Sequence, residues 1–197
     1  MDKSRKKERK KQILNAALLV LVEKGYENSR IDDIVVNSGL SKGAIYWYYT
    51  SKKEVYLDLI NFWVEKYSAL INHIVQDNHH PNQQIKDLFE YFADQFDKDP
   101  EPFQVLSEFW SMSRKDEDFK LKLQWVYSNF QLLIKSIIED GIKTGDFEDI
   151  DVNITSLSIL VNIESIMVFT LFDPNGVTPR KYFELISDFI LEGIKKR

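Results

Sequence analysis

Residues 39–53 read GLSKGAIYWYYTSKK, which combines a glycine, a serine and four consecutive aromatic side chains in one short segment. Ser41 is typical of a helix N-cap, so we predict a very short helix that continues to about Tyr48. At about 100° per residue, the side chains of Tyr46, Trp47 and Tyr48 spread over most of the circumference of such a helix. They cannot all pack inward, so at least one of them is expected to face outward.

Another short helix is predicted just before this segment, over residues 29–39. Ser29 is expected to cap it, and Asp32 and Asp33 lie in its first turn, where the helix dipole favours acidic groups. Gly39 is suited to the left-handed conformation that turns the chain. Two short helices joined by such a turn predict a helix-turn-helix, whose second helix enters the major groove of DNA.

The charge of the chain is distributed unevenly. The 197 residues carry a formal net charge of −5, yet residues 1–53 hold 12 Lys and Arg against 6 Asp and Glu. A basic N-terminal quarter on an acidic body predicts that any contact with a polyanion is confined to that quarter. The first eleven residues, MDKSRKKERKK, contain seven basic ones. We expect this arm either to enter a minor groove or lie along phosphates, or to be a solvated tail.

The rest of the sequence predicts an all-α protein of about nine helices, because apolar residues recur at helical spacing and strand-type alternation is scarce. The first helix is expected over 5–24, ending at Gly25. A fourth is expected from Ser51, which forms a capping box with Glu54, to about residue 77. The remaining helices are predicted at 83–97, 103–113, 119–143 and 152–172, followed by a last one capped by Thr178 with Pro179 at its first position.

Several classes of protein are disfavoured by composition. The absence of cysteine excludes disulfides and thiolate chemistry, and it fits the cytoplasm. No secretion signal is recognised. The apolar stretch 154–172 contains Asn162 and Glu164, so we interpret it as a buried helix, with a membrane span as a remote alternative.

An enzyme or a metal site is not expected. The sequence shows neither a glycine-rich phosphate loop nor a nucleophile elbow. His73, His79 and His80 cluster near a helix end, but carboxylates at ligand spacing do not accompany them. We therefore expect no catalytic residue, no metal and no cofactor.

The run over residues 25–55, GYENSRIDDIVVNSGLSKGAIYWYYTSKKEV, resembles the DNA-binding domain of the tetracycline-repressor (TetR) family. The resemblance is carried by Gly25-Tyr26, Ile34, Gly39, Ser41-Lys42-Gly43, Ile45-Tyr46, Tyr48-Tyr49, Ser51-Lys52 and Glu54. It implies a helix-turn-helix domain over residues 1–50 and a helical ligand-binding and dimerisation domain over residues 51–197. It also implies a homodimeric, ligand-responsive transcription factor, usually a repressor.

The resemblance also implies the residues that contact DNA. They are Ser29, Arg30, Lys42, Gly43, Ala44, Tyr46, Trp47, Tyr48 and Lys52. Many family members have histidine where Trp47 or Tyr48 stands, so no base preference is implied. Many have phenylalanine at position 49, which usually packs inward, so Tyr49 is not expected to contact DNA.

A ligand pocket is expected in the body, where aromatic residues are dense. The candidate residues are Trp63, Tyr67, Phe92, Phe96, Glu108, Phe109, Trp110, Trp125 and Phe130. A pocket and a plain core share such a lining, and each single residue is more often core. A small hydrophobic or aromatic effector, such as an acyl chain, a drug or an aromatic acid, fits this lining. The sequence does not assign Asn162 and Glu164 to one environment, which could be the pocket, a dimer interface or solvent.

Dimerisation is expected through the last two helices, whose apolar faces would otherwise remain exposed. A twofold dimer would place two recognition helices about 34–36 Å apart on a palindromic operator. Four alternatives remain open. The chain could be a DNA-binding regulator without a small-molecule ligand, a transcriptional activator, an adaptor that binds acidic proteins, or an enzyme whose substrate the sequence does not indicate.

Overall fold

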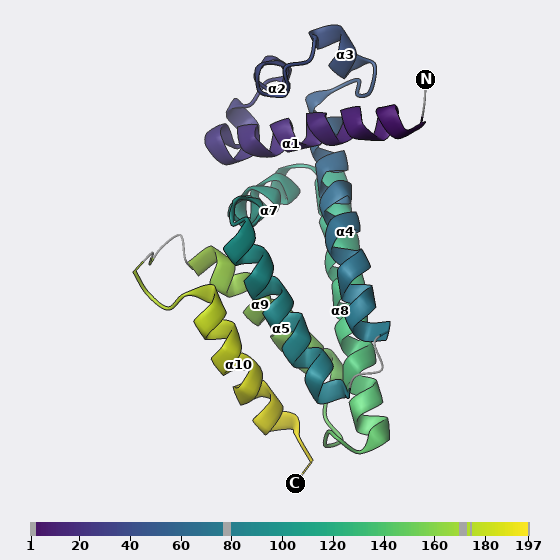
Figure 1. The fold of residues 1–197 in the computed structure, drawn as a ribbon, viewed down its shortest axis with the longest axis vertical. Helices are drawn as coiled ribbons and strands as arrows, with labels where there is room; N and C mark the ends of the chain where they lie inside the picture. The colour runs from purple at the N-terminus through teal and green to yellow at the C-terminus, as the bar shows by residue number, and fades with distance from the viewer. Residues whose placement is uncertain (1–2, 77–79, 170–172, 174, 197) are drawn as a thin grey trace. The chain divides into compact units, whose positions relative to one another are not determined.

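The computed structural model describes residues 3–76, 80–169, 173 and 175–196, and helices are its only extended regular elements (Figure 1). The all-α prediction is therefore confirmed. The helices of the described residues are α1 (Lys3–Asn28), α2 (Ile31–Ser38), α3 (Lys42–Tyr46), α4 (Lys52–Gln76), α5 (Pro81–Lys98), α6 (Glu101–Gln104), α7 (Leu106–Lys115), α8 (Glu117–Thr144), α9 (Val152–Phe169) and α10 (Pro179–Ile194). The one addition to the predicted elements is α6, a single turn beside Pro100.

The contacts within the chain divide it into two compact units. One contains residues 1–66 and 105–124, and the other contains residues 67–104 and 125–197. The first unit thus combines the helix-turn-helix with the start of α4, with α7 and with the start of α8. A boundary between separable domains at residue 50 stays a prediction.

The first unit is organised around α1, which packs against α2 while α2 packs against α3 (Figure 1). Ile13, Ala17, Ile34 and Ile45 are completely buried, so each of these three helices contributes apolar side chains to the core. Gly25 interrupts α1 with a φ of 69° and a ψ of 168°. Only glycine adopts this conformation readily, so the helix bends where the sequence predicts its end.

Most of the predicted caps are present. Gly39 is left-handed, with a φ of 66°, and the Ser41 hydroxyl accepts a hydrogen bond from the Ala44 amide at 3.2 Å. The cap predicted for α2 is wrong. Arg30 is the N-cap, and its amide donates to the Asp33 carboxylate at 2.8 Å. The Ser29 hydroxyl instead turns back and donates to the preceding helix.

The capping box at the start of α4 is displaced by one residue from its predicted form. The Glu54 amide donates to the Ser51 hydroxyl at 3.2 Å, as expected. The Glu54 carboxylate, however, accepts from the Thr50 amide at 2.6 Å rather than from that of Ser51. At the other end of the chain Thr178 caps α10 as predicted, and Pro179 is its first residue.

In the second unit, α10 packs chiefly against α5 and also contacts α9. Phe89 of α5 and Phe183 of α10 are buried with their ring centroids 5.6 Å apart. Arg180 of α10 donates to Asp94 and Asp97 of α5 at 2.5 and 2.6 Å. One fork-shaped guanidinium therefore ties the beginning of α10 to the end of α5.

Gly141 of α8 gives a sharp test of the packing in the second unit. A Cβ atom at this position would lie 2.1 Å from Cδ2 of Phe147, which is buried. We expect Gly141→Ala to destabilise the fold by at least about 1–3 kcal/mol, because the aromatic ring has to move. The measurement is the free energy of unfolding from urea denaturation.

Gly193→Ala is the matched control, since this glycine lies in α10 and its Cβ would meet no atom within 4 Å. Alanine favours a helix over glycine by up to about 1 kcal/mol, so this variant should be as stable as the parent or more stable. Equal stabilities of the two alanine variants would contradict the tight approach of Phe147 to α8.

None of the helices in the described part of the chain combines the length and hydropathy that a membrane crossing requires. The stretch 154–172 was expected to be a buried helix. Its described residues belong to α9, and residues 170–172 lie outside the described residues. Only one face of α9 is buried, with Ile159 and Ile163 inside, while Ile154 and Leu157 are exposed.

Candidate nucleic-acid interface

The segment from Lys42 to Tyr49, which is α3 with the three residues that follow it, exposes some of its apolar side chains and buries others. Ile45 and Tyr49 point into the core, whereas Tyr46 and Trp47 are 48% and 59% exposed. Tyr48 is partly exposed, and its ring meets that of Trp47 edge to face at a centroid distance of 4.6 Å. The outward-facing aromatic surface expected from the sequence is therefore present, and Tyr49 is inward as expected.

The polar residues expected to contact DNA around α3 fall into an exposed group and an engaged group. Arg30, Lys42 and Gly43 are exposed. The Lys42 ammonium pairs with Asp32 of α2 at 2.7 Å. Because both partners of this pair are solvent-accessible, it contributes little stability, and Lys42 can exchange the carboxylate for a phosphate.

Ser29 and Lys52, both expected to contact DNA, are engaged inside the first unit. Ser29 is buried, and its hydroxyl donates to the Tyr26 carbonyl at 2.8 Å. The Lys52 ammonium donates to the carbonyls of Tyr26 and Ser29 at 2.6 and 2.9 Å, and it lies 4.3 Å from the centroid of the Tyr26 ring. Burial lowers the pKa of Lys52. These two side chains stabilise the α1–α2 turn. They are less accessible to solvent than Arg30, Lys42 and Gly43.

Tyr26 connects this turn to α7 and α8. Its ring meets the rings of Tyr56 and Phe119 edge to face at 5.3 and 5.4 Å. Its amide donates to the carboxylate of Glu108 in α7 at 3.0 Å. Glu108 was a candidate for the ligand pocket, but in the structure its carboxylate holds the backbone beside Gly25.

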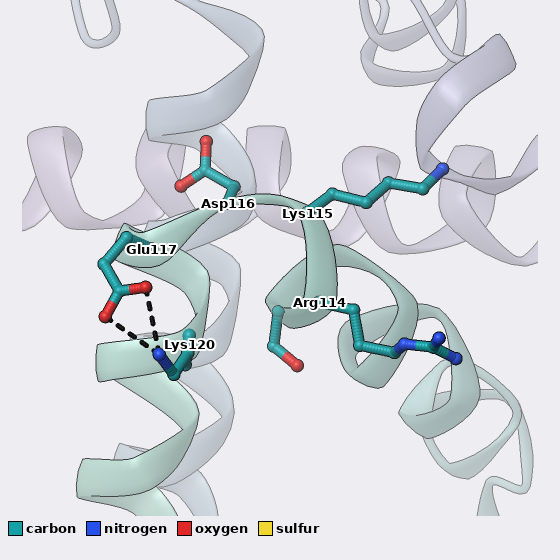
Figure 2. Close-up of a pocket in the computed structure, with 6 residues that line it drawn as sticks. Arg114, Lys115, Asp116, Glu117 and Lys120 are labelled. Carbon is teal, nitrogen blue, oxygen red and sulfur yellow. Dashed lines mark hydrogen bonds and ion pairs between the residues drawn. The ribbon is translucent and has the colours of Figure 1, made fainter.

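Ion pairs reinforce the same connection at the α7–α8 turn. Lys53 pairs with Asp116 at 2.7 Å and with Asp118 at 2.6 Å, and the bond from Lys53 holds the pKa of Asp116 below its usual range. Lys115 extends away from the turn (Figure 2) and pairs with Glu27 of α1 at 2.7 Å. The sequence separations exceed sixty residues, so these partners could not be paired from the sequence.

A hollow at this turn does not resemble a pocket for an apolar effector. Figure 2 shows its lining, in which Glu117 and Lys120 pair with each other and the Arg114 side chain extends away from them. The hollow is lined by Ser113, Arg114, Lys115, Asp116, Glu117 and Lys120. Most of the residues that line it are charged, and most of these form ion pairs with neighbouring side chains.

The aromatic candidates for the ligand pocket lie in several places. In the first unit, Trp63 and Phe109 meet edge to face at 5.9 Å. In the second unit, Phe92 lies 6.3 Å from Phe130 and Phe96 lies 5.6 Å from Phe103. The remaining candidates are not core residues: Trp110 and Trp125 are exposed. The Tyr67 side chain lies outside the described part of the chain.

The polar residues of α9 have partners within the second unit. The Tyr127 hydroxyl of α8 donates to the Glu164 carboxylate. Asn162 accepts from the Tyr182 hydroxyl of α10 and donates to the Ser158 carbonyl at 2.8 Å. Three environments were expected for these residues: the pocket, a dimer interface and solvent. The structure adds a fourth, in which each side chain forms a hydrogen bond to a neighbouring helix of the same chain.

Metal-ligating side chains do not gather into groups of three or more within the described residues. His80 faces Asp146, with Nδ1 3.2 Å from the carboxylate oxygen. His79 and the side chain of His73 lie outside the described residues.

Known proteins resemble this chain over its N-terminal segment and over its whole fold. Residues 13–59 match the family described as bacterial regulatory proteins, tetR family. An uncharacterized HTH-type transcriptional regulator of Lactococcus lactis is 30% identical over 129 residues, which cover 62% of this chain and 64% of the relative. This chain thus spans just under two thirds of that relative.

Two solved structures share the fold along nearly the whole chain. A TetR transcription regulator from Haloarcula marismortui has a TM-score of 0.85 and 18% identity, covering 96% of this chain and 100% of its own. The regulator FadR from Bacillus subtilis, in complex with stearoyl-CoA, has a TM-score of 0.82 and 17% identity, covering 93% and 98%. At these identities the likeness concerns the fold alone.

The matched segment contains α2, α3 and the surface formed by Tyr46 and Trp47. The relatives are transcription regulators rather than enzymes, which agrees with the prediction that the chain is not an enzyme. The segment that contains this surface, residues 13–59, belongs to the TetR family of bacterial regulatory proteins.

Proposed function

We propose that this regulator is a homodimeric repressor that binds a palindromic operator and releases it when a small hydrophobic or aromatic ligand binds. The observation that carries the proposal is the exposure of Tyr46 and Trp47 at the end of α3, in the same segment as Lys42 and Gly43. Exposed apolar surface that is rimmed by polar residues is typical of a binding site. Their hydroxyl and indole N–H groups suit phosphates and base edges, and Gly43 allows close approach of the DNA.

The proposed DNA contacts come from the exposed group, Arg30, Lys42 and Gly43, together with Tyr46 and Trp47. Ala44 and Tyr48 are partly exposed and lie within reach of the same face. Ser29 and Lys52 are assigned a supporting role, because they are engaged by the carbonyls of the α1–α2 turn. A regulator of this kind acts where its DNA is, which in a bacterium is the cytoplasm.

A dimer is supported by apolar stripes on the last two helices. Ile154, Leu157 and Val161 are exposed on α9 at helical spacing, and Leu185 and Phe189 are exposed one turn apart on α10. Because α9 and α10 are in contact, the stripes belong to neighbouring elements of one unit. A twofold partner would bury both in a four-helix bundle.

A ligand of acyl or aromatic character is supported by the aromatic pairs of the second unit. The Phe92–Phe130 and Phe96–Phe103 contacts bring apolar rings together in the second unit, outside the helix-turn-helix. FadR from Bacillus subtilis, which shares the fold, was solved with stearoyl-CoA. A long acyl chain is therefore the first ligand class to test.

The mechanism we propose is a shift between two states of the dimer that differ in the distance between its two helix-turn-helix domains. A ligand acts only through its different affinities for the two states, and a swing from 1:99 to 99:1 requires about 5.5 kcal/mol. The rival is a regulator with no ligand. In that case acyl-CoA and aromatic acids would neither bind nor change operator affinity.

The test is fluorescence anisotropy of the purified protein on the DNA upstream of its own gene, beside a scrambled duplex at about 0.15 M salt. Nonspecific binding at this salt is typically about 10⁻⁴–10⁻⁶ M. We expect tight binding to the first duplex alone, with two protomers per site, and release by an effective acyl or aromatic ligand. Equal weak binding to both duplexes, together with no enrichment in a random-sequence selection, would contradict a sequence-specific regulator.

The direction of regulation needs a separate assay. In transcription from the bound promoter by purified RNA polymerase, we expect less transcript when the protein is added. An increase in transcript would identify an activator, which is the alternative to the repressor proposed above.

A further inference from the structure

A shallow basic hollow lies between the N-terminal part of α1 and the α2–α3 turn. It has a volume of about 570 Å³. Arg5 and Arg9 line it from α1, and they are separated by one helical turn, so they lie on the same face of the helix. The other lining residues are Gly39, Leu40, Ser41, Ala44, Trp47 and Tyr48. The hollow therefore joins two guanidinium groups to the exposed aromatic face of α3 without an acidic residue in its lining.

Arg9 is held at the hollow by a chain of hydrogen bonds. Its guanidinium donates to the side-chain oxygen of Gln12 at 2.8 Å, and the Gln12 amide donates to the Ser38 carbonyl at 2.6 Å. Gln12 thus links α1 to the end of α2. The position of the guanidinium is fixed before any ligand binds, which lowers the entropic cost of binding.

A third cation of α1 faces the recognition helix. The Lys6 ammonium lies 5.2 Å from the centroid of the Trp47 ring, a distance at which a cation is attracted to an aromatic face. Because α1 is helical from Lys3, these basic residues belong to a helix and not to an extended arm.

The basic residues of α1 do not all have this orientation. Lys10 pairs with Asp58 of α4 at 2.7 Å and lies 5.9 Å from the centroid of the Tyr49 ring. It therefore helps to hold the first unit together. Lys7 and Lys11 are exposed and do not line the hollow. The sequence treats these residues as one basic run, whereas the structure separates them into different surfaces.

We propose that the hollow holds phosphates of the DNA strand that borders the major groove entered by α3. Arg5 and Arg9 of α1 would bind the phosphates of the DNA backbone, while Trp47 and Tyr48, which follow α3, would contact the same strand. This inference rests on the proposed DNA-binding function and specifies it further. Of the three alternatives expected for the basic arm, it selects contact along phosphates over insertion into a minor groove and over a solvated tail.

The double variant Arg5→Gln/Arg9→Gln tests the proposal through the salt dependence of operator binding. The logarithm of the association constant falls with the logarithm of the salt concentration by about 0.9 for each phosphate neutralised. We expect the double variant to reduce this slope by about 1.8. Its preference for operator over scrambled DNA should stay close to that of the parent, because phosphate contacts carry little sequence information.

Lys7→Gln/Lys11→Gln is the matched control, since it removes the same charge at the same spacing from the same helix. We expect it to leave the slope close to that of the parent. Equal reductions in both double variants would overturn the proposal in favour of a diffuse field of positive charge. An unchanged slope in the arginine variant would overturn it directly.

The single variant Arg5→Gln guards against a folding effect, because it leaves the Arg9–Gln12–Ser38 chain intact. We expect the slope to fall by about one unit with an unchanged circular dichroism spectrum. The parent protein separates the two levels of inference. If it binds operator and scrambled DNA equally, the proposed sequence-specific function fails while the slopes still test the hollow, and if it binds neither, both proposals fail.

Discussion

Phe189→Glu is expected to convert the proposed dimer into monomers and to reduce operator affinity by at least about 100-fold. Phe189 is 76% exposed on α10, so in a single chain the substitution disturbs little packing. In a twofold interface each substitution acts twice, and it places two carboxylates where two aromatic rings would be buried. Specific sites are typically bound with dissociation constants of about 10⁻⁸–10⁻¹¹ M, whereas a single helix-turn-helix domain would approach nonspecific affinity.

The measurement is mass by sedimentation equilibrium, followed by anisotropy on the operator at the same protein concentration. Phe189→Leu is the control, because it shortens the side chain but keeps it apolar, and it should remain dimeric. Leu157→Glu on α9 should behave like Phe189→Glu if both helices form the interface. A dimeric Phe189→Glu variant with full operator affinity would show that the partner is bound through another surface.

Tyr46→Ala is expected to weaken operator binding by about 1–3 kcal/mol, which is about 5- to 150-fold, without loss of helix or dimer. Nearly half of this side chain is exposed, so its removal leaves no large cavity in the core. The loss should appear as a higher dissociation constant in anisotropy titrations. Circular dichroism and sedimentation of the same sample should match the parent.

Tyr46→Phe divides the effect between ring and hydroxyl. If the hydroxyl binds a phosphate or base edge, phenylalanine should lose affinity as alanine does, and if the ring supplies the contact, phenylalanine should retain most of it. Unfolding of the alanine variant would mean that Tyr46 is a core residue. Full operator affinity in both variants would remove Tyr46 from the proposed interface.

The parts of the fold that depend on neighbouring residues were predictable from the sequence. Ser41 and Thr178 cap their helices, and Gly39 adopts the left-handed conformation, because each requirement is set within three or four residues. Ser29 shows the limit of this reasoning. Its hydroxyl could accept from an amide at the start of α2 or donate to a carbonyl near the end of α1. In the structure it donates to the Tyr26 carbonyl.

The parts that depend on tertiary packing were not predictable. Glu108 reads as a polar residue in an aromatic context, yet its partner is the amide of Tyr26, 82 residues away. Lys52 reads as a charge for DNA and is instead engaged by two carbonyls. Trp110 and Trp125 read as core or pocket residues and are exposed. Residue type alone does not determine which face of a helix a neighbour will cover.

The division of residues 42–49, which are α3 and the turn after it, between buried and exposed side chains bears on how such a protein can acquire a new target. Ile45 and Tyr49 hold the helix in place, while Lys42, Tyr46 and Trp47 extend from it. Substitutions at those three exposed positions are nearly free of the packing constraints that make most core changes harmful. Under the proposed function, a lineage, or a library varied only there, can explore new operators while the scaffold stays folded, so binding specificity is free to diverge faster than architecture.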